Sequence, residues 1–388
     1  MTARPVAPLR IAACGVVSPA GYGLDELGAA LHGRRPVCTD PAEIPGDEPM
    51  PEPVRAVPGL RAADHLGRKG TRYLDRTNTL GLVASMQALK SMAASGVDAA
   101  DGAEGADERA DMGVVIGTST GSVRSSSEFA RDTFVEDRPY LVNPGLFPNT
   151  VMNSCAGQIA IWNALHGVNA TFSGGQLSSL QAVRYARNAL ALEQADRLIT
   201  GGVEELSPQT VWAWRQSGSL PAETPVGEGC AVFVLERAAD ADSAETGAGD
   251  PPVEVLACDL AYAPAPDRRP RLLDALTAGV ERAVLRSGIA PDKVTLASLS
   301  AAAEGSGEHR IEERAIRRVL GRMPDTIRVK EVVGECYSAS GAMQLAAAVA
   351  HWRRDPAAAP GDVALITSVG RDGNVGCLVA RYGTGRPG

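Results

Sequence analysis

One side chain, Gln176, stands where a strand, a tight glycine turn and a helix would present a catalytic nucleophile. A short β-like run at residues 169–172 is followed by the turn Ser173-Gly174-Gly175 and then by apolar residues at helical spacing. Such an elbow lifts the first helical residue towards helix N-terminal amides, which favour an anion or oxyanion. Glutamine has no nucleophilic atom that covalent catalysis could use. The stretch is therefore either a nucleophile site without its chemistry or one of the turns that any α/β protein contains.

The elements that would position this elbow alternate between strands and helices. In residues 1–237 we expect strands at 9–14, 112–116, 169–172, 196–200 and 227–236, and helices at 24–31, 78–94, 122–134, 147–165 and after Gln176. The stretch 238–252 has the composition of a surface linker. In residues 253–388 we expect strands at 253–260, 294–301, 327–333, 362–367 and 376–382, and helices at 271–287, 308–320 and 339–352. This alternation predicts two halves, each with a sheet covered by helices.

Composition excludes several classes of function. The chain has 388 residues, 44% hydrophobic and 22% charged, which is typical of a globular protein with a substantial core. A net charge of -8 and only 4% aromatic residues argue against nucleic-acid binding. The seven cysteines form no CxxC pair, so neither disulfides nor a metal site is indicated, and we expect no cofactor. The absence of a signal-peptide pattern and of a membrane-length apolar stretch favours the cytoplasm.

Seven short motifs follow one another along nearly the whole chain. They are GVVSPAG (15–21), GVVIGT (113–118), FPNTVMNSCAG (147–157), the elbow, GGVE (201–204), GEGCAVFVLE (227–236) and SVGRDGNVG (368–376). In this series the chain resembles a β-ketoacyl synthase of the thiolase-like fold. The resemblance implies an α/β fold in which two pseudo-repeated βαβ halves form a five-layer αβαβα sandwich.

The residues that carry ketosynthase chemistry are replaced in this chain. The family uses a Cys on the elbow and two His in later loops, and the matching positions hold Gln176, Glu304 and Glu335, with Lys330 matching the family's lysine. Neutral imidazoles donate hydrogen bonds to the forming enolate, whereas an ionised Glu only accepts them. A buried Glu would be protonated or would pair with Lys330, and neither state restores Claisen condensation. We therefore expect no catalytic residue in this chain and no activity of the chain alone.

A Gln on the elbow together with the loss of both His resembles a chain length factor, the β subunit of a type II polyketide ketosynthase. That resemblance implies a heterodimer with a catalytic α subunit and a polyketide tunnel at the interface. The growing chain would arrive on an acyl carrier protein through the complex, in a pathway of antibiotic type. The acidic composition and the lack of a membrane-length apolar stretch give no reason to expect a nucleic-acid or membrane partner.

The family's tunnel is lined by the helical segment after the GTxxG turn, which is residues 125–134 here. Phe129 and Thr133 are the candidates for limiting chain length. Ser125, Glu128 and Asp132 share the segment, although a carboxylate is a poor wall for an apolar chain. The alternative is that these side chains simply pack within the dimer.

In the C-terminal loop, Gly370, Arg371 and Gly373 stand where the family has a phenylalanine gate. An arginine there predicts either a solvated loop or a side chain directed at the partner. Two other functions also stay open. One is altered acyl-transfer or hydrolytic chemistry with Glu304 or Glu335 as the base, because two carboxylates near one pocket suit a general base. The other is a homodimeric acyl-binding scaffold.

Overall fold

A single sheet of eleven strands runs through the part of the chain that the computed structural model describes, which is residues 7–33, 44, 49–94, 111–218, 220–238, 252–264 and 268–383. The strand order is β11-β10-β12-β13-β9-β1-β8-β6-β4-β5, and β2 pairs with β1. In the first half these strands are β1 Leu9–Ser18, β2 Gly21–Tyr22, β4 Gly113–Gly117, β5 Asn169–Phe172, β6 Arg197–Glu204 and β8 Gly229–Arg237. In the second half they are β9 Val253–Tyr262, β10 Val294–Ser298, β11 Asp325–Ile327, β12 Val363–Val369 and β13 Asn374–Tyr382. A separate pair joins β3 Val54–Arg55 to β7 Val226–Gly227.

The two halves of the sheet repeat one topology. The strands of each half can be counted along the chain from one to five, leaving out β2. The spatial order is then third, second, fourth, fifth, first in both halves, as β5-β4-β6-β8-β1 and as β11-β10-β12-β13-β9. The halves join where residues 9–11 of β1 pair with residues 253–255 of β9. The predicted pseudo-repeat is therefore confirmed. The predicted boundary at 238–252 falls almost wholly outside the described residues, so the limits of the two halves stay a prediction.

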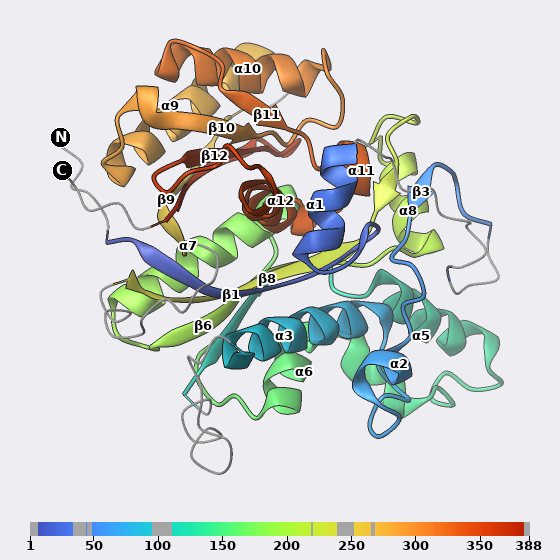
Figure 1. The fold of residues 1–388 in the computed structure, drawn as a ribbon. Helices are drawn as coiled ribbons and strands as arrows, with labels where there is room; N and C mark the ends of the chain where they lie inside the picture. Colours follow the sequence, from blue (N-terminus) through green and yellow to red (C-terminus); the bar gives the residue numbers. More distant parts are fainter. Residues whose placement is uncertain are drawn as a thin grey trace.

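Helices lie between and outside the two halves of the sheet (Figure 1). Helices α7 and α12 lie between them, α3 and α6 cover the outside of the first half, and α9 and α10 cover the outside of the second. Each of these pairs packs its buried face into a separate apolar cluster, which confirms the predicted five layers. The helices are α1 Leu24–Gly33, α2 Ala62–Leu66, α3 Arg76–Ala94, α5 Val123–Val135, α6 Ser154–Asn163, α7 Ser178–Ala191, α8 Pro208–Gln216, α9 Arg269–Ser287, α10 Gly307–Leu320, α11 Lys330–Val333 and α12 Ser340–Arg354.

Two predicted elements differ from the structure in type, beyond a shift of their ends. The predicted helix at 147–165 is a 3-10 turn, η2 (Pro144–Thr150), followed by the shorter α6, because Pro148 cannot continue an α-helix. The predicted strand at 327–333 stops at Ile327, and the next residues form the single-turn α11. In so short a run of mixed residues, periodicity does not distinguish a strand from a helix. Gly334, with φ of 79°, ends the turn.

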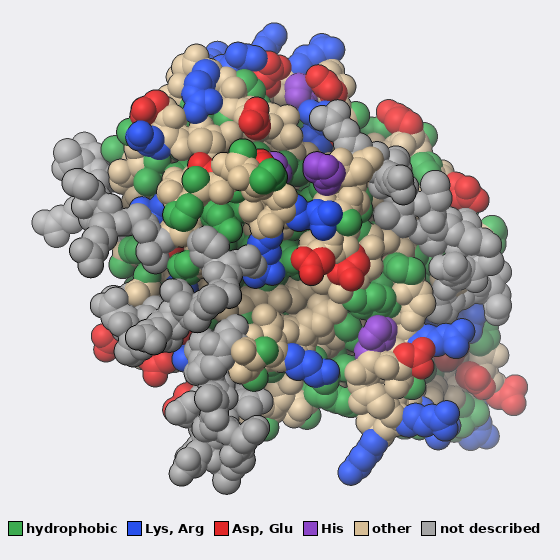
Figure 2. All heavy atoms as spheres, viewed as in Figure 1, with side chains coloured by type: hydrophobic (Ala, Val, Ile, Leu, Met, Phe, Trp, Pro, Cys, Tyr) green, Lys and Arg blue, Asp and Glu red, His purple; other side chains and the backbone are tan. Residues whose placement is uncertain are grey.

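The surface is mixed in charge. On the face drawn in Figure 2, basic and acidic side chains are interspersed. Across the described ranges, none of the helices is both long enough and apolar enough to span a membrane. Within the same ranges, no cluster of three or more His, Cys, Asp or Glu side chains could hold a metal ion.

Candidate functional site

The predicted elbow is present and is fixed by close backbone packing. Strand β5 leads to the 3-10 turn η3 (Gly175–Leu177), and α7 follows at Ser178. Gly175 has φ of 60°, a conformation that favours glycine. At Gly117 on β4, an added Cβ would lie 2.4 Å from the backbone carbon of Ser178, so a larger residue there would displace the start of α7. These glycines hold Gln176 at the elbow, where its side chain is buried.

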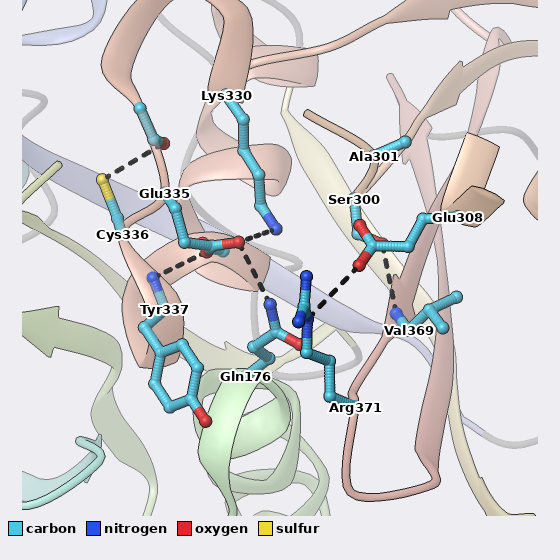
Figure 3. Close-up of polar contacts among 12 residues, drawn as sticks. Gln176, Ser300, Ala301, Glu308, Lys330, Glu335, Cys336, Tyr337, Val369 and Arg371 are labelled. Carbon is cyan, nitrogen blue, oxygen red and sulfur yellow. Dashed lines mark hydrogen bonds and ion pairs between the residues drawn. The ribbon is translucent and has the colours of Figure 1, made fainter. Parts of the chain in front are cut away.

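The amide of Gln176 is tied to the Glu335 carboxylate (Figure 3). Its Nε2 donates to Glu335 Oε2 over 3.0 Å, and Lys330 Nζ lies 2.5 Å from the same oxygen. The other oxygen, Oε1, accepts from the backbone N–H of Tyr337 at 2.8 Å and from Ser340 Oγ at 2.7 Å. The carboxylate of Glu335 therefore receives four hydrogen bonds, the full capacity of an ionised carboxyl group.

Lys330 and Glu335 form a buried ion pair. Burial lowers the pKa of Lys330, but the Glu335 and Glu308 carboxylates outweigh that effect and raise this pKa overall. Of the two states considered for Glu335, pairing with Lys330 is therefore the one observed. A carboxylate whose lone pairs are all engaged is poorly placed to take a proton from water, and it has no hydrogen bond to donate to an oxyanion.

Glu304 does not join this cluster. Its side chain is 77% exposed and contacts Arg328 at 3.3 Å, so the structure does not bring Glu304 together with Gln176 and Glu335. The reason is local, because Ser306 caps α10 and Glu304 lies in the turn before the helix begins. The carboxylate that turns inward is Glu308, which sequence reasoning missed. It precedes the buried Ile311 by three residues, and that spacing places both on one helix face.

A cavity of about 670 Å³ opens in front of Glu335. Its walls are largely apolar, and its charged lining residues include Glu308, Glu335, Arg269 and Arg371. Burial raises the pKa of Glu308, while Lys330 opposes that rise. A mostly apolar cleft with a few converging polar groups is the usual form of a ligand site, and here it ends beside the Gln176 elbow.

Arg371, in the loop between β12 and β13, has partners within this chain although its side chain is exposed. Gly370 and Gly373 flank the tip of this loop, and whether Arg371 faces a partner chain stays a prediction. Its Nη1 donates to the carbonyl of Gly218 at 2.6 Å, and its Nε lies 3.9 Å from Glu308 Oε1. The loop is therefore fastened to the end of α8 and to the first turn of α10.

Helix α5 carries the five predicted tunnel residues, and none of its residues is fully buried. The Phe129 ring lies 5.7 Å from the Phe147 ring of η2. The Thr133 hydroxyl donates to the carbonyl of Ala130 on its own helix. The three others have polar partners, with Ser125 Oγ donating to Asp75 at 3.3 Å, Glu128 pairing with Arg124 at 2.7 Å and Asp132 lying 3.6 Å from Arg131. Among the five predicted tunnel residues, Phe129 is thus the one whose side chain is apolar, as contact with an apolar chain requires.

Two further carboxylates are buried at the end of β6, beside the elbow. Glu204 accepts hydrogen bonds from Ser119 Oγ at 2.6 Å and from the backbone N–H and hydroxyl of Ser338. Glu205 accepts one from the hydroxyl of Ser122, the N-cap of α5, at 2.9 Å. Burial raises the pKa of Glu204 to about 7 and that of Glu205 to about 7. This pair links the start of α5 to the loop that carries Glu335.

Stability is expected to fall as the pH rises from about 4 to about 7, because the folded chain keeps protons on Glu204 and Glu205 that the unfolded chain has released. A carboxyl with a raised pKa contributes stability that is complete below its unfolded pKa and is lost as the pH rises through its folded pKa. Glu205→Gln removes one of these two titrating carboxyl groups. Its free energy of unfolding, from urea melts between pH 4 and 8, should decline less than that of the wild type, by on the order of 2–3 kcal/mol. Glu136→Gln, at an exposed position, should follow the wild type. Parallel profiles for wild type and Glu205→Gln would contradict this account.

Residues 8–241 match the family model described as beta-ketoacyl synthase, N-terminal domain. A 3-oxoacyl-(acyl-carrier-protein) synthase 2 of Vibrio cholerae is 28% identical over 151 residues, which is 39% of this chain and 34% of that protein. The chloroplastic 3-oxoacyl-(acyl-carrier-protein) synthase I of Arabidopsis thaliana is 24% identical over 322 residues, 75% of this chain and 64% of that protein. The matched segments thus cover 34% of the length of the first relative and 64% of the length of the second, which is less than two thirds in both cases.

Solved structures match over almost the full chain. A structure described as the ishigamide ketosynthase/chain length factor is 30% identical, with a TM-score of 0.80, over 97% of this chain and 100% of that chain. A beta-ketoacyl synthase from Burkholderia phymatum STM815 has a TM-score of 0.80 at 20% identity, over 98% of this chain and 100% of that chain. The second likeness is evidence of a shared fold alone.

Proposed function

This chain belongs to the beta-ketoacyl synthase family, and from that premise we propose that it is a non-catalytic subunit of the chain-length-factor kind. In this proposal it pairs in the cytoplasm with a catalytic ketosynthase and shapes the tunnel of a type II polyketide synthase. One observation carries the proposal, namely that Gln176 occupies the elbow and is hydrogen-bonded to Glu335, which pairs with Lys330. The 30% identity to the ishigamide ketosynthase/chain length factor supports it.

The cluster at the elbow lacks both parts of condensing chemistry. Acyl transfer to an enzyme needs a nucleophile, and the Gln176 amide is not one. Enolate stabilisation needs hydrogen-bond donors aimed at the forming charge, whereas the nearest donors, from Gln176 and Lys330, are directed at Glu335. The thiol of Cys336 is no substitute, because it is fully buried against the carbonyl of Glu228 and burial raises its pKa well above the usual range.

The same geometry weighs against the altered-chemistry alternative. Glu335 has its lone pairs engaged, and Glu304 is exposed beside Arg328. Neither is therefore placed as a general base over the cavity. The homodimeric scaffold remains the alternative that the partner experiment must separate from the proposal.

Exposed apolar side chains support a partner on the α5 side of the molecule. We name as the α5 face the exposed apolar residues of α5, η2, α6 and the loop before α6, which include Phe134, Phe147, Met152 and Ile161. Strand β5 ends the strand order, and among the described residues its ladder partner is β4 alone. An apolar surface beside an open sheet edge is typical of a protein interface.

Co-expression with a ketosynthase that has a complete Cys/His/His triad, encoded beside this chain, tests the proposal. We expect a one-to-one complex that condenses malonyl units on a carrier protein, while each chain alone does not. Mass determination in solution separates this outcome from the homodimer. Elongation or thioester hydrolysis by this chain alone would overturn the proposal, as would failure to form a complex.

Gln176→Cys purified without a partner is expected to show no condensing activity. The new thiol would face Glu335 instead of an imidazole, so no neutral donor would steady the enolate. Malonyl condensation followed by mass spectrometry of the carrier-bound product measures this. The complete ketosynthase under the same conditions is the positive control, and chain elongation by the single variant would contradict the prediction.

Phe129→Ala, assayed within the complex, is expected to lengthen the product by one or more ketide units. Removing the ring would leave Phe147 without its aromatic contact and open space on α5 for a longer apolar chain. Product mass after reaction with malonyl units provides the measurement. Arg131→Ala on the exposed side of the same helix is the matched control and should leave the product unchanged. An unchanged product from an intact Phe129→Ala complex would remove Phe129 from the tunnel.

A further inference from the structure

The carboxylate of Glu308 lines the cavity of about 670 Å³ without a hydrogen bond to hold it. Glu335, which also lines the cavity, accepts four hydrogen bonds, whereas no donor contacts the Glu308 carboxylate among the residues that the structure describes. Arg371 Nε lies 3.9 Å from Glu308 Oε1, which is too far for a hydrogen bond (Figure 3). A carboxylate in a largely apolar wall is stabilised by a donor that a ligand brings.

The side chain of Arg269 lines the same cavity from the start of α9. An added Cβ at Gly307 would lie 3.2 Å from Arg269 Nη2, and Gly307 directly precedes Glu308 on α10. The two opposite charges therefore stand at adjacent places on one wall. Within the described ranges they form no ion pair with each other, and Arg269 has no hydrogen-bond or ion-pair partner there. Both groups keep hydrogen-bonding positions for a ligand.

Apolar side chains continue this wall on both helices. Leu272 follows Arg269 by three residues on α9, and Ile311 follows Glu308 by three on α10, so each charge has an apolar neighbour on its own helix face. The volume of about 670 Å³ lies within the range of small-molecule sites. The cavity thus combines a carboxylate, a guanidinium and a large apolar surface.

A neutral or singly charged ligand would satisfy only part of this wall. An uncharged arm would remove water from Glu308 and Arg269 without replacing it by an ionic contact, and a fatty acid would bring a second anion next to Glu308. An amine without a carboxylate would leave Arg269 unused. A zwitterion supplies a partner for both groups, and charge-assisted hydrogen bonds are about twice as strong as neutral ones.

We propose that this cavity binds an α-amino acid with a large apolar side chain, with its ammonium group on Glu308 and its carboxylate on Arg269. The apolar side chain would lie against Leu272 and Ile311. Binding forms no covalent bond, so the amino acid stabilises the folded chain in proportion to its affinity. The inference goes beyond the proposed function, because the cavity lining includes none of the residues named for the α5 face.

Isothermal titration calorimetry of the isolated chain tests this assignment with a matched series of probes. Phenylalanine, leucine, methionine and tryptophan are titrated first, with glycine as the zwitterion that lacks the apolar part. The tightest of the four is then compared with its N-acetyl derivative, which lacks the ammonium group, and with its decarboxylated amine. We expect glycine and both derivatives to bind at least about tenfold more weakly, because each loses one of the three contacts.

Two variants assign the charges. Glu308→Gln should weaken binding of the amino acid about tenfold or more and leave the N-acetyl derivative unaffected, because that derivative has no ammonium group to lose a partner. Arg269→Gln should weaken the amino acid to a similar extent and leave the decarboxylated amine unaffected. Glu304→Gln and Arg268→Gln, at exposed positions outside the cavity lining, are the matched controls and should bind as the wild type does.

Failure of all four amino acids to bind at millimolar concentration would overturn the proposal, as would equal affinity for the N-acetyl derivative or tighter binding of pantetheine, an uncharged arm. The probe series on the wild-type chain decides the question even if a variant does not fold. Because no partner subunit is present, the result is separate from that of the co-expression experiment. An inactive complex would leave the amino acid site standing, and a chain that binds no amino acid would leave the proposed function standing.

Discussion

Lys330→Met lowers the free energy of unfolding by about 3–5 kcal/mol, in our expectation, because it leaves Glu335 as a buried charge without its cation. Lys330 and Glu335 are both almost completely buried, so water cannot replace the missing partner. Urea melts at pH 7 measure the loss. Since the pKa of Lys330 is raised by folding, its contribution is complete at neutral pH and is lost only as the pH rises through the folded value.

A double replacement separates charge from packing in that result. Combining Lys330→Met with Glu335→Gln removes both charges, and we expect it to recover most of the stability, because a neutral pair of similar volume avoids the cost of burying ions. Lys69→Met at an exposed position is the matched control and should change stability by less than about 0.5 kcal/mol. A loss below about 1 kcal/mol for Lys330→Met would show that the ion pair does not organise the site.

Phe134→Asp together with Ile161→Asp should weaken binding to the proposed ketosynthase partner by about 100-fold or more. The two side chains are 86% and 75% exposed on the α5 face, so charges there would have to be desolvated in a complex while the free chain keeps its fold. Titration of the purified partner provides the affinity, and urea melts of the free variant confirm that its stability is nearly unchanged.

The matched control for this pair lies on the other half of the molecule. Leu285 on α9 is also exposed, at 53%, and Figure 1 shows α9 on the side away from α5. Leu285→Asp should leave partner affinity unchanged. Equal weakening by Leu285→Asp, or none by the α5-face variant, would locate the interface elsewhere.

Local patterns in the sequence predicted the elbow and the alternation of strands with helices, whereas the five layers were implied by the resemblance to the ketosynthase family. The turn before Gln176 needs glycines, and the helix after it shows its buried face through residues such as Leu180 and Val183. The pairing of Lys330 with Glu335 is one of the two alternatives given for a buried Glu335, since a buried carboxyl either keeps its proton or pairs with a cation. These features depend on contacts between residues close in sequence, so the spacing of residue types along the chain is enough to predict them.

Features that depend on contacts between distant segments were not predicted. Glu304 and Glu308 are four residues apart, and which of them faces the cavity depends on where α10 begins. The bond from Arg371 to Gly218 joins residues 153 positions apart, so no local pattern could signal it. The short turn at α11 was read as a strand because its few residues fit either period.

The junction of β1 with both β8 and β9 has a consequence for synthesis on the ribosome. The first strand emerges long before either neighbour, and it gains β8 only when residue 237 has been made. Residues 9–11 then offer an edge on which β9 starts the second half. A product truncated after the first half would keep that edge uncovered, and unpaired edges are sites of aggregation. Premature termination is therefore more harmful to this architecture than to one whose halves are not joined by a strand ladder.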